Sequence, residues 1–427
     1  MNRLIQWLFA CGAVMLAMTV CADEKHMGVA TCASSVCHGN ATSKPDANIL
    51  HSEYVIWGQE DPHAGAYNIL LSVESARIAA KLNIGRAEEA PVCLSCHSDY
   101  VAKADRGERF QLSDGVGCEG CHGGAGKWLE THTVRGATHD DNIAHGLRAL
   151  EKADVKAQLC QSCHIGGEGR FAGHDIMGAG HPRLQFELAN YSAALPEHHR
   201  VDDDYRKRKA TFTELQLWSE GQLQSALNVL DGIGSERFYQ GGMWPELAFF
   251  DCHVCHQAMS PQNWQQRDAS KDLPPGTVRL NDSALIMASL LWQIRNESAA
   301  KNWSEGVRAL HRASQKGVEP TREVAGMLKN QVRSMIASLQ KKPLSDPEAS
   351  RLLRLMVAYS REQSFNDYLT AEQITMAINI MMHSDAVANP DAFGAPLDAL
   401  YDSLGDQHTF QAWKFRQAMD RFSGQLR

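Results

Sequence analysis

The chain has 427 residues, enough for two domains, and carries a formal net charge of −8 at pH 7. This acidic balance argues against nucleic acid or an anionic membrane surface as a partner. The unusual part of the composition is its 12 cysteines and 19 histidines, most of which lie in the first two thirds of the chain.

The first 22 residues have the pattern of a signal peptide. Arg3 gives a short basic start, and the stretch 4–20 is mostly apolar and precedes small residues that suit cleavage. The alternative is a retained membrane anchor, although about 17 residues is at the short limit for crossing a bilayer. Cleavage would remove Cys11 and Cys21. We therefore expect an exported protein located in the periplasm, with no lipid anchor.

Four copies of the pattern Cys-X-X-Cys-His follow, and a looser copy with four residues between its cysteines precedes them. The strict pattern is the attachment site of c-type haem. Two thiols one helical turn apart can each add to a vinyl group on one porphyrin edge, and the next histidine then becomes the proximal iron ligand. The predicted covalent positions are Cys32, Cys37, Cys93, Cys96, Cys118, Cys121, Cys160, Cys163, Cys252 and Cys255, and the predicted proximal ligands are His38, His97, His122, His164 and His256.

The alternatives to haem attachment are a redox dithiol, half of a zinc site or, for Cys32 and Cys37 alone, a plain disulfide. Once residues 1–22 are removed, all ten remaining cysteines fall in the five motifs and none is left over. We therefore expect five covalently bound haem c groups, or four if Cys32 and Cys37 hold none.

The fold is expected to be mainly α. Residues 23–275 are predicted to form a multihaem cytochrome c domain, in which short helices and loops wrap the haems. Glycine-bearing turns such as 123–126 make poor helix interiors there, and porphyrins would supply much of the apolar core. Residues 276–427 contain no cysteine and are predicted to form an all-helical bundle.

Several helices are predicted individually. The first part has helical spacing at 52–57 and 64–82, and a capping box at Thr211-Phe-Thr-Glu214. In the second part a helix starts at Asp282 or Ser283, and 321–339 has one apolar face. Two more starts are predicted from the signals Ser345-Asp-Pro-Glu348 and Thr370-Ala-Glu-Gln373.

The sixth ligand of each iron decides between an electron carrier and a catalyst. The ample supply of further histidines predicts mostly histidine–histidine ligation, and hence lower potentials than histidine–methionine ligation would give. In 173–182, His174 and His181 are stronger donors than Met177. Eleven histidines are available in the haem region besides the proximal ones: His26, His51, His63, His132, His139, His145, His174, His181, His198, His199 and His253.

The motifs resemble the tetrahaem cytochrome c-554 type, which takes electrons from hydroxylamine oxidoreductase, and its longer pentahaem relatives. The resemblance covers roughly residues 29–205. It rests on a helix ending Glu60-Asp-Pro-His63, on Gly115-Val-Gly-Cys-Glu-Gly-Cys-His-Gly123 followed by His132, and on Cys160-Gln-Ser-Cys-His164. The longer relatives also look similar over 177–187 and 196–205.

Carried over to these positions, the resemblance makes His63 and His132 distal iron ligands, with His174 and His181 in the same role at other haems. His198 or its neighbour His199 is a candidate for the fifth distal ligand. The other histidines are expected to be solvent-exposed, to lie beside a haem or, in the case of His311, His383 and His408, to be surface or core residues.

The chain departs from the short members of this family in its looser first motif, its fifth motif and its helical tail. In the tetrahaem relatives the second haem, which matches Cys93, Cys96 and His97, lacks a protein sixth ligand. If that holds here, this iron can bind a small molecule such as nitric oxide. If His174 or His198 caps it, the site is closed.

Two functions remain open. The first is a periplasmic carrier that passes single electrons between a redox protein donor and an acceptor through closely spaced haems. The second is a reductase or oxidase of a small nitrogen or sulfur compound at one open haem. No Cys-X-X-Cys-Lys motif is present, and no residue is assigned a catalytic role. Asp99, Asp114 and Glu119 are either acid–base candidates or solvated carboxylates.

Overall fold

The structure is a computed structural model that describes residues 25–426 except 45, 46, 48, 168, 239–245, 257–266, 275, 276, 363, 385, 386, 388 and 406. The predicted signal peptide and the predicted domain boundary at 275/276 lie outside these residues. The described chain is mainly helical, at 65% helix, and contains isolated bridges but no β-strand, so the predicted fold class is confirmed. None of the described helices combines the length and the apolar character needed to cross a membrane.

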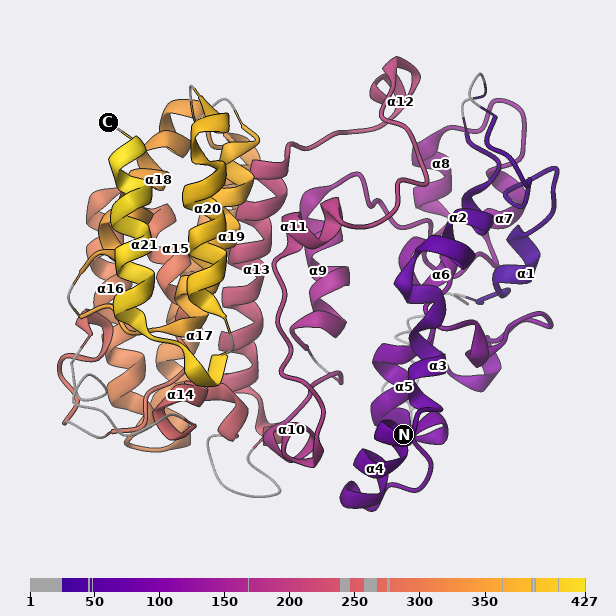
Figure 1. The fold of residues 1–427 in the computed structure, drawn as a ribbon. Coiled ribbons are helices and arrows are strands. Elements are labelled where there is room, and N and C mark those ends of the chain that lie inside the picture. The colour runs from indigo at the N-terminus through magenta and orange to yellow at the C-terminus, as the bar shows by residue number, and fades with distance from the viewer. Residues whose placement is uncertain are drawn as a thin grey trace, which may run out of the picture.

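Short helices joined by turns make up the N-terminal part, which lies at one side of the molecule in Figure 1. The helix predicted over 64–82 is in fact two helices, because the chain turns at Leu71 and Ser72. The Ser72 hydroxyl accepts a hydrogen bond from the backbone N–H of Ser75 and caps the second helix. The helices are α1 (Val29–Cys32), α2 (Glu53–Glu60), α3 (Ala66–Leu70), α4 (Val73–Leu82), α5 (Pro91–His97), α6 (Cys118–His122), α7 (Trp128–Thr131) and α8 (His139–Ala144).

The middle of the chain connects this part to the helical bundle. Its longest element, α13, packs against α9 and α11 as well as against the helices of the bundle (Figure 1). The short helix α12 projects from the molecule in the same view. The elements are α9 (Ala153–His164), α10 (His174–Ala179), α11 (Leu188–Ala193), α12 (Asp203–Arg208), α13 (Glu214–Gly234) and α14 (Cys252–Cys255).

Long helices make up the C-terminal part, and they pack side by side as a bundle (Figure 1). The predicted helix over 321–339 lies within the longest of them, and the predicted start at Ser283 is observed. The helices are α15 (Ser283–Arg295), α16 (Glu297–Ser314), α17 (Val318–Lys341), α18 (Asp346–Ser360), α19 (Tyr368–Met382), α20 (Gly394–Leu404) and α21 (Ala412–Gln425).

Two of the three predicted capping boxes were wrong. Helix α13 begins at Glu214, and Thr213 rather than Thr211 forms the box, with Gln216 as its partner. Helix α19 is capped by Asp367, whose carboxylate accepts two backbone N–H groups and leaves Thr370 inside the helix. The box at Ser345 is confirmed.

One large apolar core fills the bundle and includes most of the inward face of α13, with Trp218, Trp303 and Phe415 fully buried. This core therefore crosses the predicted boundary between residues 275 and 276. The N-terminal part has only a small second cluster around Leu70 and Leu94. Its polypeptide alone buries few large apolar side chains, which is what a domain built around porphyrins requires.

Candidate haem sites

Each cysteine pair lies on a helix or at a helix end. Helix α5 ends at His97, α6 at His122 and α9 at His164, so the three strict motifs there place both thiols one helical turn apart, with the histidine next in the chain. The fifth motif lies on α14 and its histidine follows the helix. In the looser motif Cys32 ends α1, and Cys37 follows in a turn.

Every one of the five proximal histidines faces a second histidine from elsewhere in the chain. The pairs, with the distances between ring centroids, are His38 with His132 at 6.4 Å, His97 with His181 at 6.3 Å, His122 with His198 at 6.3 Å, His164 with His63 at 5.9 Å, and His256 with His174 at 6.3 Å. The partners are the five residues that the sequence predicted as distal ligands.

The spacing within these pairs is that of two imidazoles on opposite sides of one metal ion. A metal–imidazole nitrogen bond is about 2.0–2.1 Å long, so two such bonds in line place the two ring centroids roughly 6 Å apart. A direct hydrogen bond between the rings would bring them closer than this. The five pairs therefore leave room for an iron atom between the rings, and the donor set fits haem.

Carboxylates hold two of these imidazoles by the nitrogen that does not face the partner. His38 Nδ1 lies 3.1 Å from Glu53 Oε2, and His63 Nδ1 lies 2.8 Å from Asp61 Oδ1. Metal-binding histidines usually donate their second N–H to such a group, which fixes the tautomer and the ring orientation. The hydrogen bond to Asp61 raises the pKa of His63, and the one to Glu53 raises the pKa of His38.

Backbone carbonyl oxygens orient three more of these imidazole rings in the same way. The Nδ1 atoms of His97, His132 and His181 lie 3.1 Å, 2.6 Å and 2.7 Å from the carbonyl oxygens of Ala66, Leu129 and Pro182, respectively. In each case Nε2 is left free to bind a metal ion.

Burial keeps the His122 ring neutral. Loss of hydration on burial, with smaller contributions from the nearby His198 and Lys209, lowers the pKa of His122 to about 3. A neutral imidazole has a free lone pair at neutral pH, which a metal ligand must offer.

Motifs distant in the sequence lie next to one another. The side chain of Cys32 lies beside that of Cys118, and the side chain of Cys96 lies beside that of Cys163. The first motif therefore adjoins the third, and the second adjoins the fourth.

The other histidines in the described part of the chain use their ring nitrogens elsewhere. His51 and His145 bond to backbone carbonyls, His139 pairs with Glu151, and His253 Nε2 lies 2.8 Å from the carbonyl oxygen of Gln407. His311 is a core residue of the bundle, where Nε2 lies 2.9 Å from Asp282 Oδ2. His199 contacts His198 and Tyr205, so of the two candidates His198 is the one that faces a proximal histidine.

The carboxylates near the motifs have structural surroundings. Glu119 is 2% exposed and accepts hydrogen bonds from the backbone N–H groups of Met27, Gly28 and Ala125. Asp99 pairs with His26 at 2.7 Å. Glu119 is thus a buried group that holds the backbone at Met27 and Gly28, and it is not a solvated carboxylate.

Sequence reasoning missed Glu53 and Asp61 as the groups that orient His38 and His63. The signal for Asp61 was present, because it stands two residues before His63 and caps the same turn through the His63 backbone N–H. Glu53 had no comparable signal, since it meets His38 from a separate helix, α2.

The ten motif cysteines are free thiols in the described part of the chain, and none of them forms a disulfide there. The one described group of three side chains close enough to share a metal ion, His26, Asp99 and Glu119, contains no cysteine.

Cys-X-X-Cys-His motifs on short helices, with a second histidine opposite each motif histidine, are the arrangement typical of c-type cytochromes. Residues 31–123 match the family model described as cytochrome c554 and c-prime, and this match supports a c554-type multihaem cytochrome. It covers roughly a fifth of the chain, including the first three motifs and His63, and is shorter than the resemblance seen in the sequence. No curated protein and no solved structure matches the chain.

A c-type cytochrome of this kind carries covalently bound haem c, works in electron transfer and has redox proteins as its partners.

Proposed function

We propose that the protein is a periplasmic electron carrier with five haem c groups, each iron held between two histidines. The axial pairs are His38 and His132, His97 and His181, His122 and His198, His164 and His63, and His256 and His174. When bound, each haem gains or loses a single electron at its iron. Residues 23–275 carry the haems in this proposal, and residues 276–427 form the supporting bundle.

One observation carries this proposal. All five motif histidines have a second imidazole at 5.9–6.4 Å, and none of the five lacks one. Two strong axial ligands leave no vacant position on an iron, which suits electron transfer rather than the binding of a substrate.

The pairing of His97 with His181 bears directly on the catalytic alternative. That alternative requires one iron without a second protein ligand, and the second haem was the expected place for it. The histidine that faces His97 is neither His174 nor His198, the two that we considered from the sequence, but His181. With His181 as its partner, the iron at His97 would have a second protein ligand, as it would with His174 or His198.

The chain itself does three things in this function. Cysteine pairs would hold each porphyrin in place, and the second and fourth motifs, whose Cys96 and Cys163 are neighbours, would hold two of the haems close together. The groups bonded to Nδ1 of His38, His63, His97, His132 and His181 fix these five imidazole rings, so little rearrangement would accompany a change in charge at the irons. The chain has a formal net charge of −8, which haem propionates would make more negative. This charge favours basic docking sites on the redox partners.

The test is a haem count by pyridine haemochrome and mass, together with low-temperature electron paramagnetic resonance of the oxidised holoprotein. We expect five haems and an entirely low-spin spectrum. A high-spin signal that disappears on addition of nitric oxide or hydroxylamine would contradict the carrier and favour the reductase or oxidase. A count of four would show that Cys32 and Cys37 hold no haem.

A further inference from the structure

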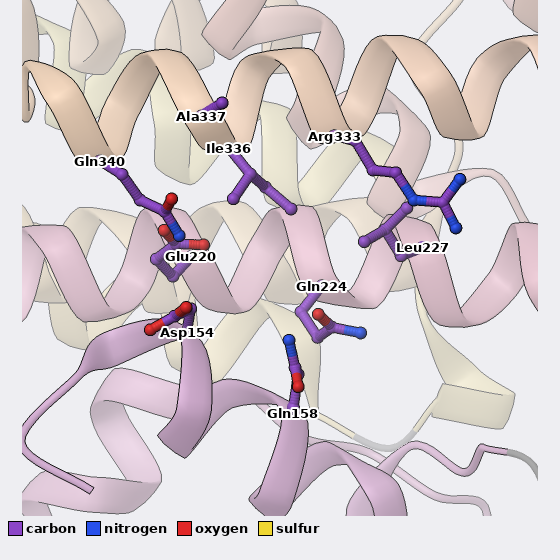
Figure 2. Close-up of a pocket in the computed structure, with 9 residues that line it drawn as sticks. All are labelled: Asp154, Gln158, Glu220, Gln224, Leu227, Arg333, Ile336, Ala337 and Gln340. Atoms are coloured by element: carbon purple, nitrogen blue, oxygen red, sulfur yellow. The ribbon is translucent and has the colours of Figure 1, made fainter. Parts of the chain in front are cut away.

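A polar cavity lies where three helices meet, between the haem-bearing helix α9 and the helices α13 and α17. Its volume is about 250 Å³. Figure 2 shows Glu220 projecting into it from α13, with Asp154 of α9 on one side and Gln340 of α17 on the other. Gln340 and Gln158, which also line the cavity, are exposed, so water can reach it.

Glu220 is buried in an environment that favours its protonated form. It is only 6% exposed. Loss of hydration, and then the negative charge of Asp154, raise the pKa of Glu220 to about 7, against a hydrogen bond to Gln340 that acts in the opposite direction.

Among the described residues, no cation that lines the cavity pairs with this carboxylate. Besides Glu220, the charged groups that line it are Asp154 on α9 and Arg333 on α17. The Arg333 guanidinium lies toward the other end, beside Leu227 (Figure 2). A charge change nearby therefore acts on Glu220 with little compensation from a partner.

The carboxylate is tied to the fourth haem motif through its neighbour in the chain. Gln161, which stands between Cys160 and Cys163, is 1% exposed and donates a 2.7 Å hydrogen bond from Nε2 to the carbonyl oxygen of Gly221. Asp154 stands on α9 as well, at the end opposite His164. The cavity and the motif thus share two packed helices and a direct contact.

We propose that Glu220 is a proton-binding site linked to the redox state of the haem attached to Cys160 and Cys163, so that the protein carries a proton with that electron. This inference rests on the proposed function, because it requires haem at the fourth motif.

The proposed coupling of one electron to one proton conserves charge and mass. A donor redox protein would supply one electron to the haem that Cys160, Cys163 and His164 would hold, and this electron would make the surroundings more negative by one charge. The Glu220 carboxylate then takes up to one proton from the water of the cavity. When the electron leaves for the acceptor protein, the proton returns to water. By linkage, the affinity for the electron falls as the pH rises through the range in which Glu220 titrates.

The test is a spectroelectrochemical titration of the holoprotein between about pH 5.5 and 8.5, on the wild type and Glu220→Gln. Glutamine keeps the size of the side chain and its hydrogen bond to Gln340, so the variant is expected to fold. In the wild type one component has a midpoint potential that falls with pH across neutrality. In Glu220→Gln that component loses this dependence while the others keep theirs.

Two further variants sharpen the test. Glu214→Gln removes an exposed carboxylate from the same helix and should leave the wild-type pH dependence in place. Asp154→Asn removes the negative neighbour and should move the pH range over which the midpoint potential changes to lower pH.

Infrared difference spectra between the oxidised and reduced holoprotein should contain a protonated carboxyl band that Glu220→Gln lacks.

An identical pH dependence in wild type and Glu220→Gln would overturn the proton link and leave the electron carrier intact. Absence of haem from the Cys160 and Cys163 peptide in mass spectra would instead contradict the proposed function at that motif. The two failures are therefore distinguishable.

Discussion

The ring of His181 lies 6.3 Å from the ring of His97, and the two planes meet at 84°. His181 stands two residues after the end of α10, and its Nδ1 lies 2.7 Å from the carbonyl oxygen of Pro182. In the proposed carrier His181 would be the second protein ligand of the iron at His97. Without it, that iron would have a position open to a small molecule.

Replacement of His181 by alanine should open that iron. We expect about one iron in five to become high-spin and to bind carbon monoxide or nitric oxide in the reduced protein, because no other described histidine faces His97. Electron paramagnetic resonance and optical spectra of the holoprotein measure this. The control is His145→Ala, which removes an exposed histidine bonded to its own helix. A spectrum of His181→Ala that stays fully low-spin would mean that another side chain ligates this iron.

The sequence named candidate haem ligands but not how they pair. Motif spacing named the five motif histidines, the resemblance named His63, His132, His174 and His181, and the fifth candidate stayed open between His198 and His199. Pairing joins positions far apart, such as His122 with His198 and His63 with His164. The pairing depends on the path of the whole chain, and this path cannot be predicted from local sequence spacing.

Local patterns also failed where two of them competed. Thr211 and Thr213 both stand three residues before a Glu or Gln, and only the structure shows that Thr213 forms the box. Asp367 displaced Thr370 as a cap because its carboxylate accepts two backbone N–H groups and the Thr370 hydroxyl. The packing of α13 into the bundle had no sequence signal beyond its apolar face.

Arg267 lies at the centre of a buried ionic network that joins the fifth motif region to the bundle. It is 3% exposed and contacts both Asp282 and Asp367. Asp282 in turn meets His311, and Arg267 holds the pKa of Asp282 at about 2, although burial alone would raise it.

We expect Arg267→Met to destabilise the protein by about 3–5 kcal/mol, since it leaves two buried carboxylates without their cation. Chemical denaturation measures this loss. Arg361→Met is the matched control, because Arg361 pairs with Asp420 on the surface, and it should cost only about 0–1 kcal/mol. Equal effects of the two substitutions would show that the network contributes little to stability.

Gly221 marks the closest approach of α13 to α9 and α11. A Cβ atom at this position would lie 2.9 Å from Leu188 Cβ and 3.6 Å from Gln161 Nε2. We expect Gly221→Ala to destabilise the protein by about 1–2 kcal/mol, because overpacking outweighs the better helix propensity of alanine. The strain should also weaken the hydrogen bond from Gln161.

The control for Gly221 is Gly326→Ala on α17, where an added Cβ would meet no atom within 4 Å. That change should stabilise the protein by about 0.5–1 kcal/mol. Thermal unfolding of the two variants should therefore shift in opposite directions. A gain in stability for both would mean that α13 and α9 can separate without loss.

The pH dependence of stability offers a test of Glu220 that does not depend on electron transfer. Burial and Asp154 raise the pKa of Glu220 from its ordinary value near 4.5 to about 7 in the folded chain. The folded state then binds this proton more tightly than the unfolded state, so the wild type loses stability as the pH rises from about 4.5 to about 7. Glutamine stays uncharged throughout and avoids this loss.

The free energy of unfolding of Glu220→Gln should equal that of the wild type at pH 4 and exceed it by about 1–2 kcal/mol at pH 8, with screening by water in the cavity limiting the gain. Denaturant titrations at the two pH values measure the difference, and a difference independent of pH would contradict the raised pKa.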